Sequence, residues 1–229
     1  MTVLIVGNSV SQPPAPGVPG FPERLAARAQ GRWRVDTIVN SGATIEQMEG
    51  EAMAALAKAP DRLILQIGIN ECAPRPLNWE ERERLGRLRP AALRNLIIRA
   101  IHFWRPQIIR ARRLQQFTPL PRFVASAGRI VAAAAARGTP VLVLPITPVT
   151  PAAEVRTPFT NREIQRYNDG LATLAGPLIS IVTQPQLFGA MTAEQLCVTP
   201  ESVHLAGDAH ERIAAFIAAW LERPAAAAS

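Results

Sequence analysis

Short apolar runs alternate with segments of helical periodicity along most of this chain, and this alternation limits the folds open to it. The runs are rich in Val, Ile and Leu, and they predict strands over residues 3–6, 34–39, 62–67, 139–145 and 178–182. Helices are predicted over residues 21–29, 45–58, 161–174 and 208–221. Strands separated by helices form mostly parallel sheets covered on both faces. The right-handed crossover rule then favours a three-layer α/β/α sandwich around a five-stranded, mostly parallel sheet.

The stretch between the third and fourth predicted strands is too long for one crossover helix. Helices are predicted there over residues 80–88, 91–104 and 123–136. We treat residues 79–122 as a helical insert within a single domain of residues 1–223, and residues 224–229 as a frayed tail. Segment 105–121 is basic and broken by proline, which suits a lid over a site or a surface for a partner. The alternative is that these helices simply pack on the sheet.

The formal net charge is +7, and Lys58 is the only lysine, so arginine carries nearly all the positive charge. The coding bias of a GC-rich genome is one explanation for so much arginine. The arginines are nevertheless concentrated in the insert: Arg82, Arg84, Arg87, Arg89, Arg94, Arg99, Arg105, Arg110, Arg112, Arg113 and Arg122. Such a patch attracts an anionic substrate or an acidic carrier protein. Nucleic acid is not expected, because aromatics make up only 5% of the chain and no nucleic-acid module is recognisable.

Several classes of protein are excluded by composition. No apolar run approaches the roughly 20 residues of a membrane span. The first apolar run lacks a basic segment ahead of it and is too short for a signal peptide, so we expect a cytoplasmic protein. Cys72 and Cys197 are too few and too far apart for a disulfide framework, and with three histidines they do not suggest a metal site. No cofactor is expected.

Polar residues follow three of the predicted strands. Ser9 lies just beyond the first strand and Gly7, where it is either a nucleophile or a residue that turns the chain. Gly42 follows the second strand and Asn70 the third. The carboxyl ends of parallel strands meet at one edge of a sheet, so these loops should lie together. The N–H groups of Ser9 and Gly42 and the amide of Asn70 could then form an oxyanion hole.

A fourth polar block directly precedes the last predicted helix and contains His204 and Glu201. A serine nucleophile needs a general base, and histidine suits that task near neutral pH. A carboxylate must hold the imidazole in the right tautomer, and Glu201, three residues before His204, is close enough in sequence to do so. His210 could replace His204 as base, but it should lie inside the helix, so we expect a structural role for it.

These blocks stand in the chain as GNS (7–9), Gly42, GINE (68–71) and ESVH (201–204). In this order and spacing the chain resembles the SGNH hydrolases, the GDSL-like serine esterase superfamily. The resemblance implies the SGNH form of the sandwich, which is flavodoxin-like. It also implies that Ser9 is the nucleophile, His204 the base, and Gly42 and Asn70 parts of the oxyanion hole.

The chain departs from the family pattern at three acidic positions. Asn8, Glu71 and Glu201 each stand where the family has Asp. Asn8 removes a charge beside the nucleophile, and the longer Glu201 leaves open that another group, such as a backbone carbonyl, orients His204. Asn8, Glu71 and Arg75 are candidates for substrate binding, and Arg75 could hold a substrate carboxylate or phosphate unless it forms an ordinary surface ion pair.

We therefore predict a serine hydrolase that cleaves carboxylic esters, such as acetyl esters or thioesters, through an acyl-serine intermediate. Two alternatives remain open at this point. The same acyl-enzyme could pass its acyl group to an alcohol or amine, as in an acyltransferase. The scaffold could also be a non-catalytic binding module whose insert docks an acidic partner.

Overall fold

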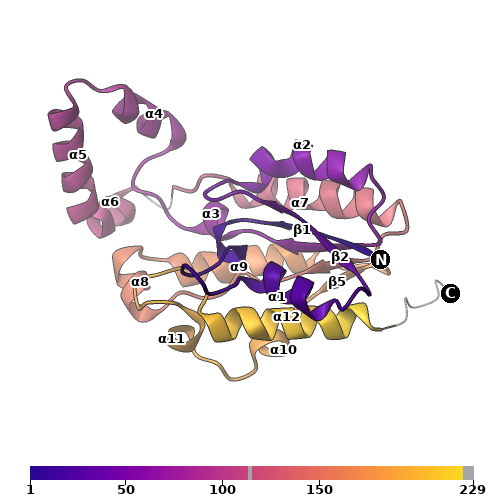
Figure 1. The fold of residues 1–229 in the computed structure, drawn as a ribbon. Coiled ribbons are helices and arrows are strands. Elements are labelled where there is room, and N and C mark those ends of the chain that lie inside the picture. The colour runs from indigo at the N-terminus through magenta and orange to yellow at the C-terminus, as the bar shows by residue number, and fades with distance from the viewer. Residues whose placement is uncertain (113–114, 224–229) are drawn as a thin grey trace.

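The computed structural model describes residues 1–112 and 115–223, and it forms the predicted sandwich around one sheet (Figure 1). The sheet has five strands in the order β2-β1-β3-β4-β5, and every neighbouring pair is parallel. The strands are β1 (Thr2–Gly7), β2 (Arg34–Val39), β3 (Arg62–Gln66), β4 (Val141–Val143) and β5 (Ile179–Ile181). The predicted fold class is therefore confirmed, with β4 and β5 shorter than expected.

Helices cover both faces of the sheet. On one face, α1 (Phe21–Arg28) packs against α12 (Gly207–Leu221). On the other, α7 (Leu120–Ala135) packs against both α2 (Ile45–Leu56) and α9 (Thr160–Ala172). This double cover explains why β1 and β3 consist of almost continuous apolar residues, since both of their faces are buried.

The strand order places a switch point between β1 and β3. From β1 the chain crosses to β2 on one side, and all later strands are added on the other side. In open α/β sheets, ligands bind at the carboxyl ends of the strands beside such a point. Gly7 ends β1 and pairs with Val39 of β2 and Gln66 of β3, so the loops that follow these three strands start from neighbouring positions.

Two glycines are required where β1 and β3 end. A Cβ on Gly7 would lie 2.3 Å from Oγ of Ser11, which donates a hydrogen bond to Gln66. Gly68 has φ +121°, and a Cβ there would lie 2.2 Å from Cδ1 of Ile146. Close packing at both strand ends thus leaves no room for a side chain at either position.

Some short elements escape the sequence patterns. They are the 3₁₀ turn η1 (Ser9–Ser11), α3 (Ile69–Cys72), α8 (Pro151–Arg156), α10 (Gln184–Phe188) and α11 (Ala193–Leu196). Each is too short to show helical periodicity. No helix within the described ranges is long and apolar enough to span a membrane.

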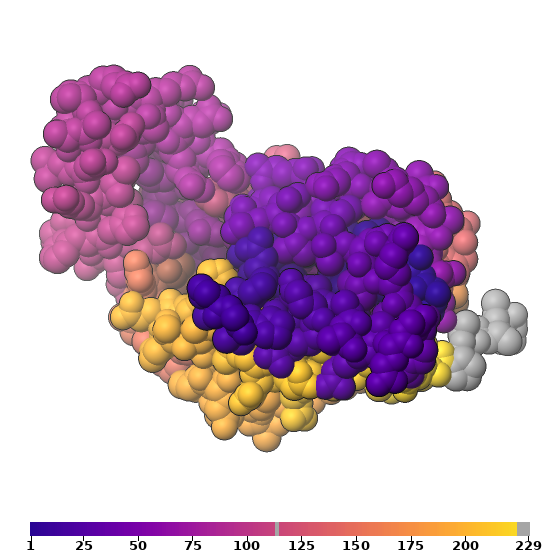
Figure 2. Space-filling model, viewed as in Figure 1, coloured from indigo at the N-terminus to yellow at the C-terminus, as the bar shows by residue number. Residues whose placement is uncertain are grey.

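The insert forms a lobe at one end of the molecule (Figures 1 and 2). It contains α4 (Trp79–Arg87), α5 (Ala91–Phe103) and α6 (Arg105–Ala111), and neither α4 nor α5 has a fully buried residue. These two helices stand away from the sheet, whereas α7 covers it. The expectation of a frayed tail at 224–229 falls outside the described residues, and the single-domain span 1–223 stays a prediction.

We expect Gly68→Ala to destabilise the fold by about 2–4 kcal/mol, because it adds strain at positive φ to a clash with Ile146. Gly138→Ala is the matched control, since Gly138 also has positive φ (+72°), but a Cβ there would meet no atom of the described chain within 4 Å beyond its immediate neighbours. It should cost only about 1–2 kcal/mol. Urea unfolding of both variants measures the difference, and equal losses would contradict the packing argument.

Candidate active site

Ser9 lies at the start of η1, directly after β1, and is partly exposed. The side chain of Asn8 caps this turn, because its Oδ1 accepts a hydrogen bond from the N–H of Val10 at 3.1 Å. Asn8 is fully buried, and its Nδ2 has no partner among the described residues. A neutral amide keeps the capping acceptor without burying a charge. Asn8 therefore stabilises the turn that carries Ser9. Because it is fully buried, it cannot contact a substrate as predicted.

The loop after β2 lies next to the loop after β3. Nδ2 of Asn70 donates to the carbonyl oxygen of Ala43 at 2.9 Å, which places the Asn70 amide beside Gly42. Gly42 is exposed and has φ +74°. No described residue accepts a hydrogen bond from the N–H of Ser9 or of Gly42. The three predicted oxyanion donors thus come from adjacent loops, and two of them are unengaged.

Glu71 ties these two loops together from inside. Its Oε1 accepts a hydrogen bond from the N–H of Ile45 at 2.6 Å, while Oε2 has no partner among the described residues. The side chain is fully buried, and this burial raises the pKa of Glu71 to about 7, although hydrogen bonds from the N–H groups of Ile45, Glu71 and Gly68 oppose the shift. Like Asn8, Glu71 supports the site and is not placed to touch a substrate.

His204 lies in a turn that several hydrogen bonds hold. Val198 donates its N–H to the carbonyl of His204 at 2.9 Å, and Cys197 bridges to Leu205. The imidazole is exposed, and its Nδ1 lies 3.4 Å from Oγ of Ser202. Within the described ranges, no hydrogen bond joins His204 to Ser9. In unliganded enzymes such catalytic contacts are often long and tighten only when substrate binds.

Glu201 does not contact His204 in this conformation. Its carboxylate pairs with Arg156 at 3.5 Å, and the two side chains are 68% and 52% exposed. Exposed pairs of this kind contribute little, typically below about 1 kcal/mol. The hydroxyl of Ser202, which the sequence did not single out, is instead the group beside Nδ1 of His204.

His210 is a structural residue. It is buried in α12, and its Nδ1 accepts a hydrogen bond from the N–H of Phe21 at 3.0 Å. Burial, with smaller contributions from Arg24 and His204, lowers the pKa of His210 to about 4. A neutral, engaged imidazole of this kind fits the role expected from its position inside the helix.

A cavity of about 270 Å³ borders the loop after β3 that carries Asn70. Asn70 lines it on one side, and Glu201 and Val203 line it on the side of the His204 turn. Three arginines complete its wall: Arg75, Arg105 and Arg156. The sequence predicted Arg75 at this place, but nothing distinguished Arg105 and Arg156 from the many other arginines.

Arg75 is held in place beside Asn70. Its Nη2 donates to the carbonyl of Asn70 at 3.2 Å, and its guanidinium lies 4.6 Å from the centre of the Phe117 ring. Arg75 forms no ion pair with any described residue, so the alternative of an ordinary surface ion pair is wrong. Burial, followed by the positive charges of Arg105 and Arg82, lowers the pKa of Arg75 to about 10.

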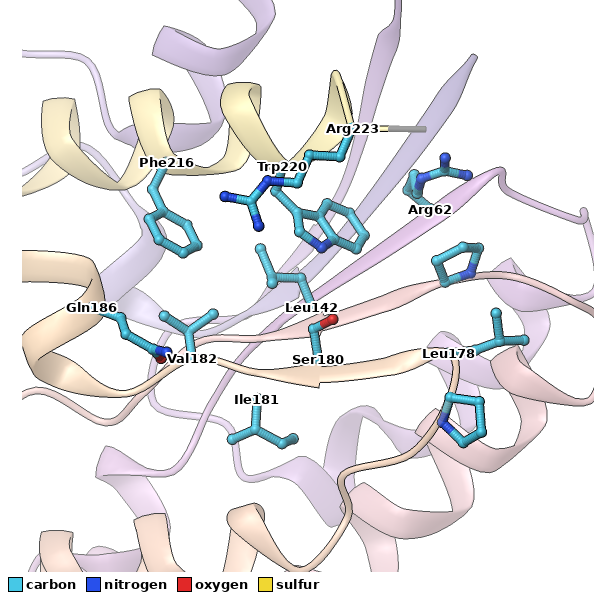
Figure 3. A pocket seen from close by; sticks show the side chains of 12 residues that line it. Arg62, Leu142, Leu178, Ser180, Ile181, Val182, Gln186, Phe216, Trp220 and Arg223 are labelled. Atoms are coloured by element: carbon cyan, nitrogen blue, oxygen red, sulfur yellow. The ribbon is translucent and has the colours of Figure 1, made fainter. Parts of the chain in front are cut away.

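A larger cavity of about 500 Å³ lies elsewhere, along the edge strand β5 (Figure 3). Phe216 and Trp220 of α12 face Leu142 and Ser180 across it. None of the predicted site residues lines this cavity, so its size does not make it the candidate active site.

The sequence profile of the GDSL-like Lipase/Acylhydrolase family matches residues 5–212. This chain belongs to that family. The predicted resemblance is thereby confirmed, and so is the prediction of an esterase-type enzyme at the level of the family. No functionally curated protein matches the chain by sequence.

Solved structures share the fold over nearly the whole chain. A lipase/acylhydrolase from Enterococcus faecalis has a TM-score of 0.63 at 10% identity, covering 96% of this chain and 95% of its own. TesA has a TM-score of 0.60 at 19% identity, with 97% and 98% covered. A catalytic mutant of Axe2, an acetylxylan esterase from Geobacillus stearothermophilus, has a TM-score of 0.59 at 13% identity, with 97% and 94% covered.

We expect Glu71→Gln to change how stability depends on pH. Because the pKa of Glu71 in the folded protein, about 7, lies above the ordinary 4.5, the native state binds this proton more tightly than the unfolded chain does. The stability that the protonated carboxyl contributes is complete below about pH 4.5 and is lost as the pH rises to about 7. Glutamine has no such proton to lose.

Urea unfolding at about pH 5 and about pH 7.5 measures the effect. Between these values the free energy of unfolding of the wild type should fall by ~2 kcal/mol relative to Glu71→Gln. Glu83→Gln, which changes a 65% exposed side chain of the insert, is the control and should follow the wild type. A constant difference between wild type and Glu71→Gln would contradict the prediction.

Proposed function

We propose that this chain hydrolyses carboxylic esters of small acyl groups through an acyl-serine intermediate on Ser9. The observation that carries the proposal is the convergence of the Ser9, Gly42 and Asn70 loops beside a cavity that the His204 turn also borders. Axe2, which shares the fold, is an acetylxylan esterase, and a cavity of about 270 Å³ suits a short acyl group.

The proposed reaction begins when Oγ of Ser9 attacks the acyl carbon while Nε2 of His204 accepts the hydroxyl proton. The N–H groups of Ser9 and Gly42 and Nδ2 of Asn70 hold the oxyanion as the carbonyl becomes tetrahedral. His204 then donates the proton to the leaving alcohol or thiol. Water, activated by the same histidine, attacks the acyl-serine and releases the carboxylic acid and the free serine.

For Glu201 we propose that the carboxylate leaves Arg156 and orients His204 once substrate is bound. The Glu201–Arg156 pair is exposed and weak, so little free energy opposes this movement. The carboxylate would then stabilise the imidazolium that forms when Ser9 loses its proton. The hydroxyl of Ser202 is the competing candidate for this positioning role.

We further propose that the protein works in the cytoplasm, since both of its cysteines are buried and unpaired. An acidic carrier protein as partner remains a prediction about the insert. Within the described part of the insert, three arginines already pair with its own glutamates: Arg84 with Glu80, Arg87 with Glu83, and Arg112 with Glu81. This internal pairing reduces the charge that α4 offers to a partner.

Ser9→Ala and His204→Ala should each lower kcat for 4-nitrophenyl acetate by about 10³-fold or more. Ser9→Ala should also abolish labelling by a fluorophosphonate probe. His210→Asn is the control, because its side-chain oxygen can still accept the N–H of Phe21, and it should keep turnover within a few fold.

Labelling that survives Ser9→Ala would contradict the assignment of Ser9 as the nucleophile. A wild type that shows neither labelling nor turnover would contradict the esterase function and favour the binding-module alternative. Turnover lost in His210→Asn but kept in His204→Ala would overturn the assignment of the base. Product analysis with an added alcohol separates hydrolysis from acyl transfer, since a transferase would yield a new ester instead of the free acid.

Glu201→Gln should lower kcat by at least about 10²-fold with little change in KM, because the amide cannot stabilise the imidazolium. Ser202→Ala is the matched variant and should lower kcat by less than about tenfold. The opposite ranking, with Ser202→Ala the more damaging change, would show that the hydroxyl positions His204.

A further inference from the structure

We propose that the cavity beside Asn70 binds an anionic group of the substrate, a carboxylate or a phosphate, through Arg75, Arg105 and Arg156. The inference rests on the proposed esterase function and adds the chemical class of the ester. The substrate would carry its negative charge a few bonds from the scissile carbonyl, because the arginines share one small cavity with the oxyanion asparagine.

The three arginines reach the cavity from separate parts of the chain. Arg75 follows α3, Arg105 begins α6 of the insert, and Arg156 ends α8. Glu201 is the only acidic residue among the described residues that line the cavity, and it pairs with Arg156 alone. The wall therefore has an excess of positive charge that the protein itself does not neutralise.

Unpaired positive charges in this cavity cost free energy when no anion is bound. Arg75 and Arg105 are largely removed from water, and each is close enough to another arginine to feel its charge. Neither forms an ion pair with a described residue. The Nε of Arg75 is buried and has no hydrogen-bond partner in the described part of the chain. Buried charges are normally paired, so an anion in the cavity would satisfy groups that the fold leaves open.

The arginines are also held in place for such a ligand. Arg75 is fixed by the carbonyl of Asn70 and the ring of Phe117. The Nε of Arg105 donates to Oγ1 of Thr157 at 3.1 Å, which leaves its two terminal nitrogens for another acceptor. Guanidinium groups that are already oriented bind carboxylates and phosphates in the two-pronged manner that favours arginine over lysine.

The insert gains a role from this arrangement. Arg105 lies where α6 packs against α8, so the insert places one of its many arginines in the cavity wall. Arg75 and Arg105 also border a second cavity of about 370 Å³ inside the insert, whose lining includes Leu85, Ile98 and Ile101. The anion would thus be held where the insert joins the body of the protein.

The test compares two esters with acyl groups of equal carbon number, mono(4-nitrophenyl) succinate, which is anionic, and 4-nitrophenyl butyrate, which is neutral. The wild type should show a kcat/KM at least about tenfold higher for the anionic ester. Arg105→Gln and Arg156→Gln should each lower the ratio of the two kcat/KM values by about tenfold. Arg156 is 52% exposed, so its replacement is not expected to prevent folding.

Arg110→Gln is the matched control, because Arg110 is exposed on the same helix as Arg105 and does not line the cavity. It should change the ratio by less than twofold. A wild type that turns over the neutral ester but shows no preference for the anionic one would overturn the anion site while leaving the esterase function intact.

Thermal unfolding tests the anion site without turnover. Succinate or inorganic phosphate should raise the Tm of the wild type above that in sodium chloride of equal ionic strength, and Arg156→Gln should lose this increase. The anion with the larger effect identifies the carboxylate or the phosphate as the group bound. No increase with either anion would overturn the proposal, whereas an increase without any ester turnover would overturn the esterase function alone.

Discussion

The candidate active site depends on one buried hydrogen bond, from the N–H of Ile45 to the carboxylate of Glu71. It joins the loop after β3 to the start of α2, and so fixes where the Gly42 loop lies relative to Asn70. The fully buried carboxylate carries a large desolvation cost, which backbone N–H groups offset in part, with a smaller contribution from the positive charge of Arg75. The fold accepts this cost where it brings together the loops of Gly42 and Asn70, the two residues proposed to complete the oxyanion hole.

The sequence predicted the main architecture because the pattern of apolar residues that indicates strands and helices recurs along the chain. Short, β-branched apolar runs such as that of β1 favour strands buried on both faces, and the apolar stripe of α12 favours a helix packed on the sheet. The short helices α8 and α10 were not predictable in this way. They are set by proline at their first turn and by caps such as Thr150, which act over a few residues and leave no periodic pattern.

The site was predictable only in part. The loops that carry Ser9, Gly42 and Asn70 could be grouped in advance, because the ends of parallel strands share one edge. The directions in which the side chains point could not be predicted. Asn8 and Glu71 face inward and Glu201 faces Arg156, although each stands beside a residue assigned to the chemistry. The grouping of arginines around the cavity could not be predicted either. Arg105 and Arg156 are distant in sequence and come together only because α6 packs on α8.

The insert contributes little to the packed core and yet reaches the cavity beside Asn70. Its helices α4 and α5 have no fully buried residue. Most substitutions in either helix should therefore leave the packing of the core unchanged. Yet the same segment leads into Arg105, beside the loop that holds Asn70. Surface substitutions on these two helices should therefore cost little folding stability, whereas a change in how α6 packs on α8 would move Arg105 relative to the cavity. The lobe thus joins a surface that is free to vary to a residue of the cavity wall.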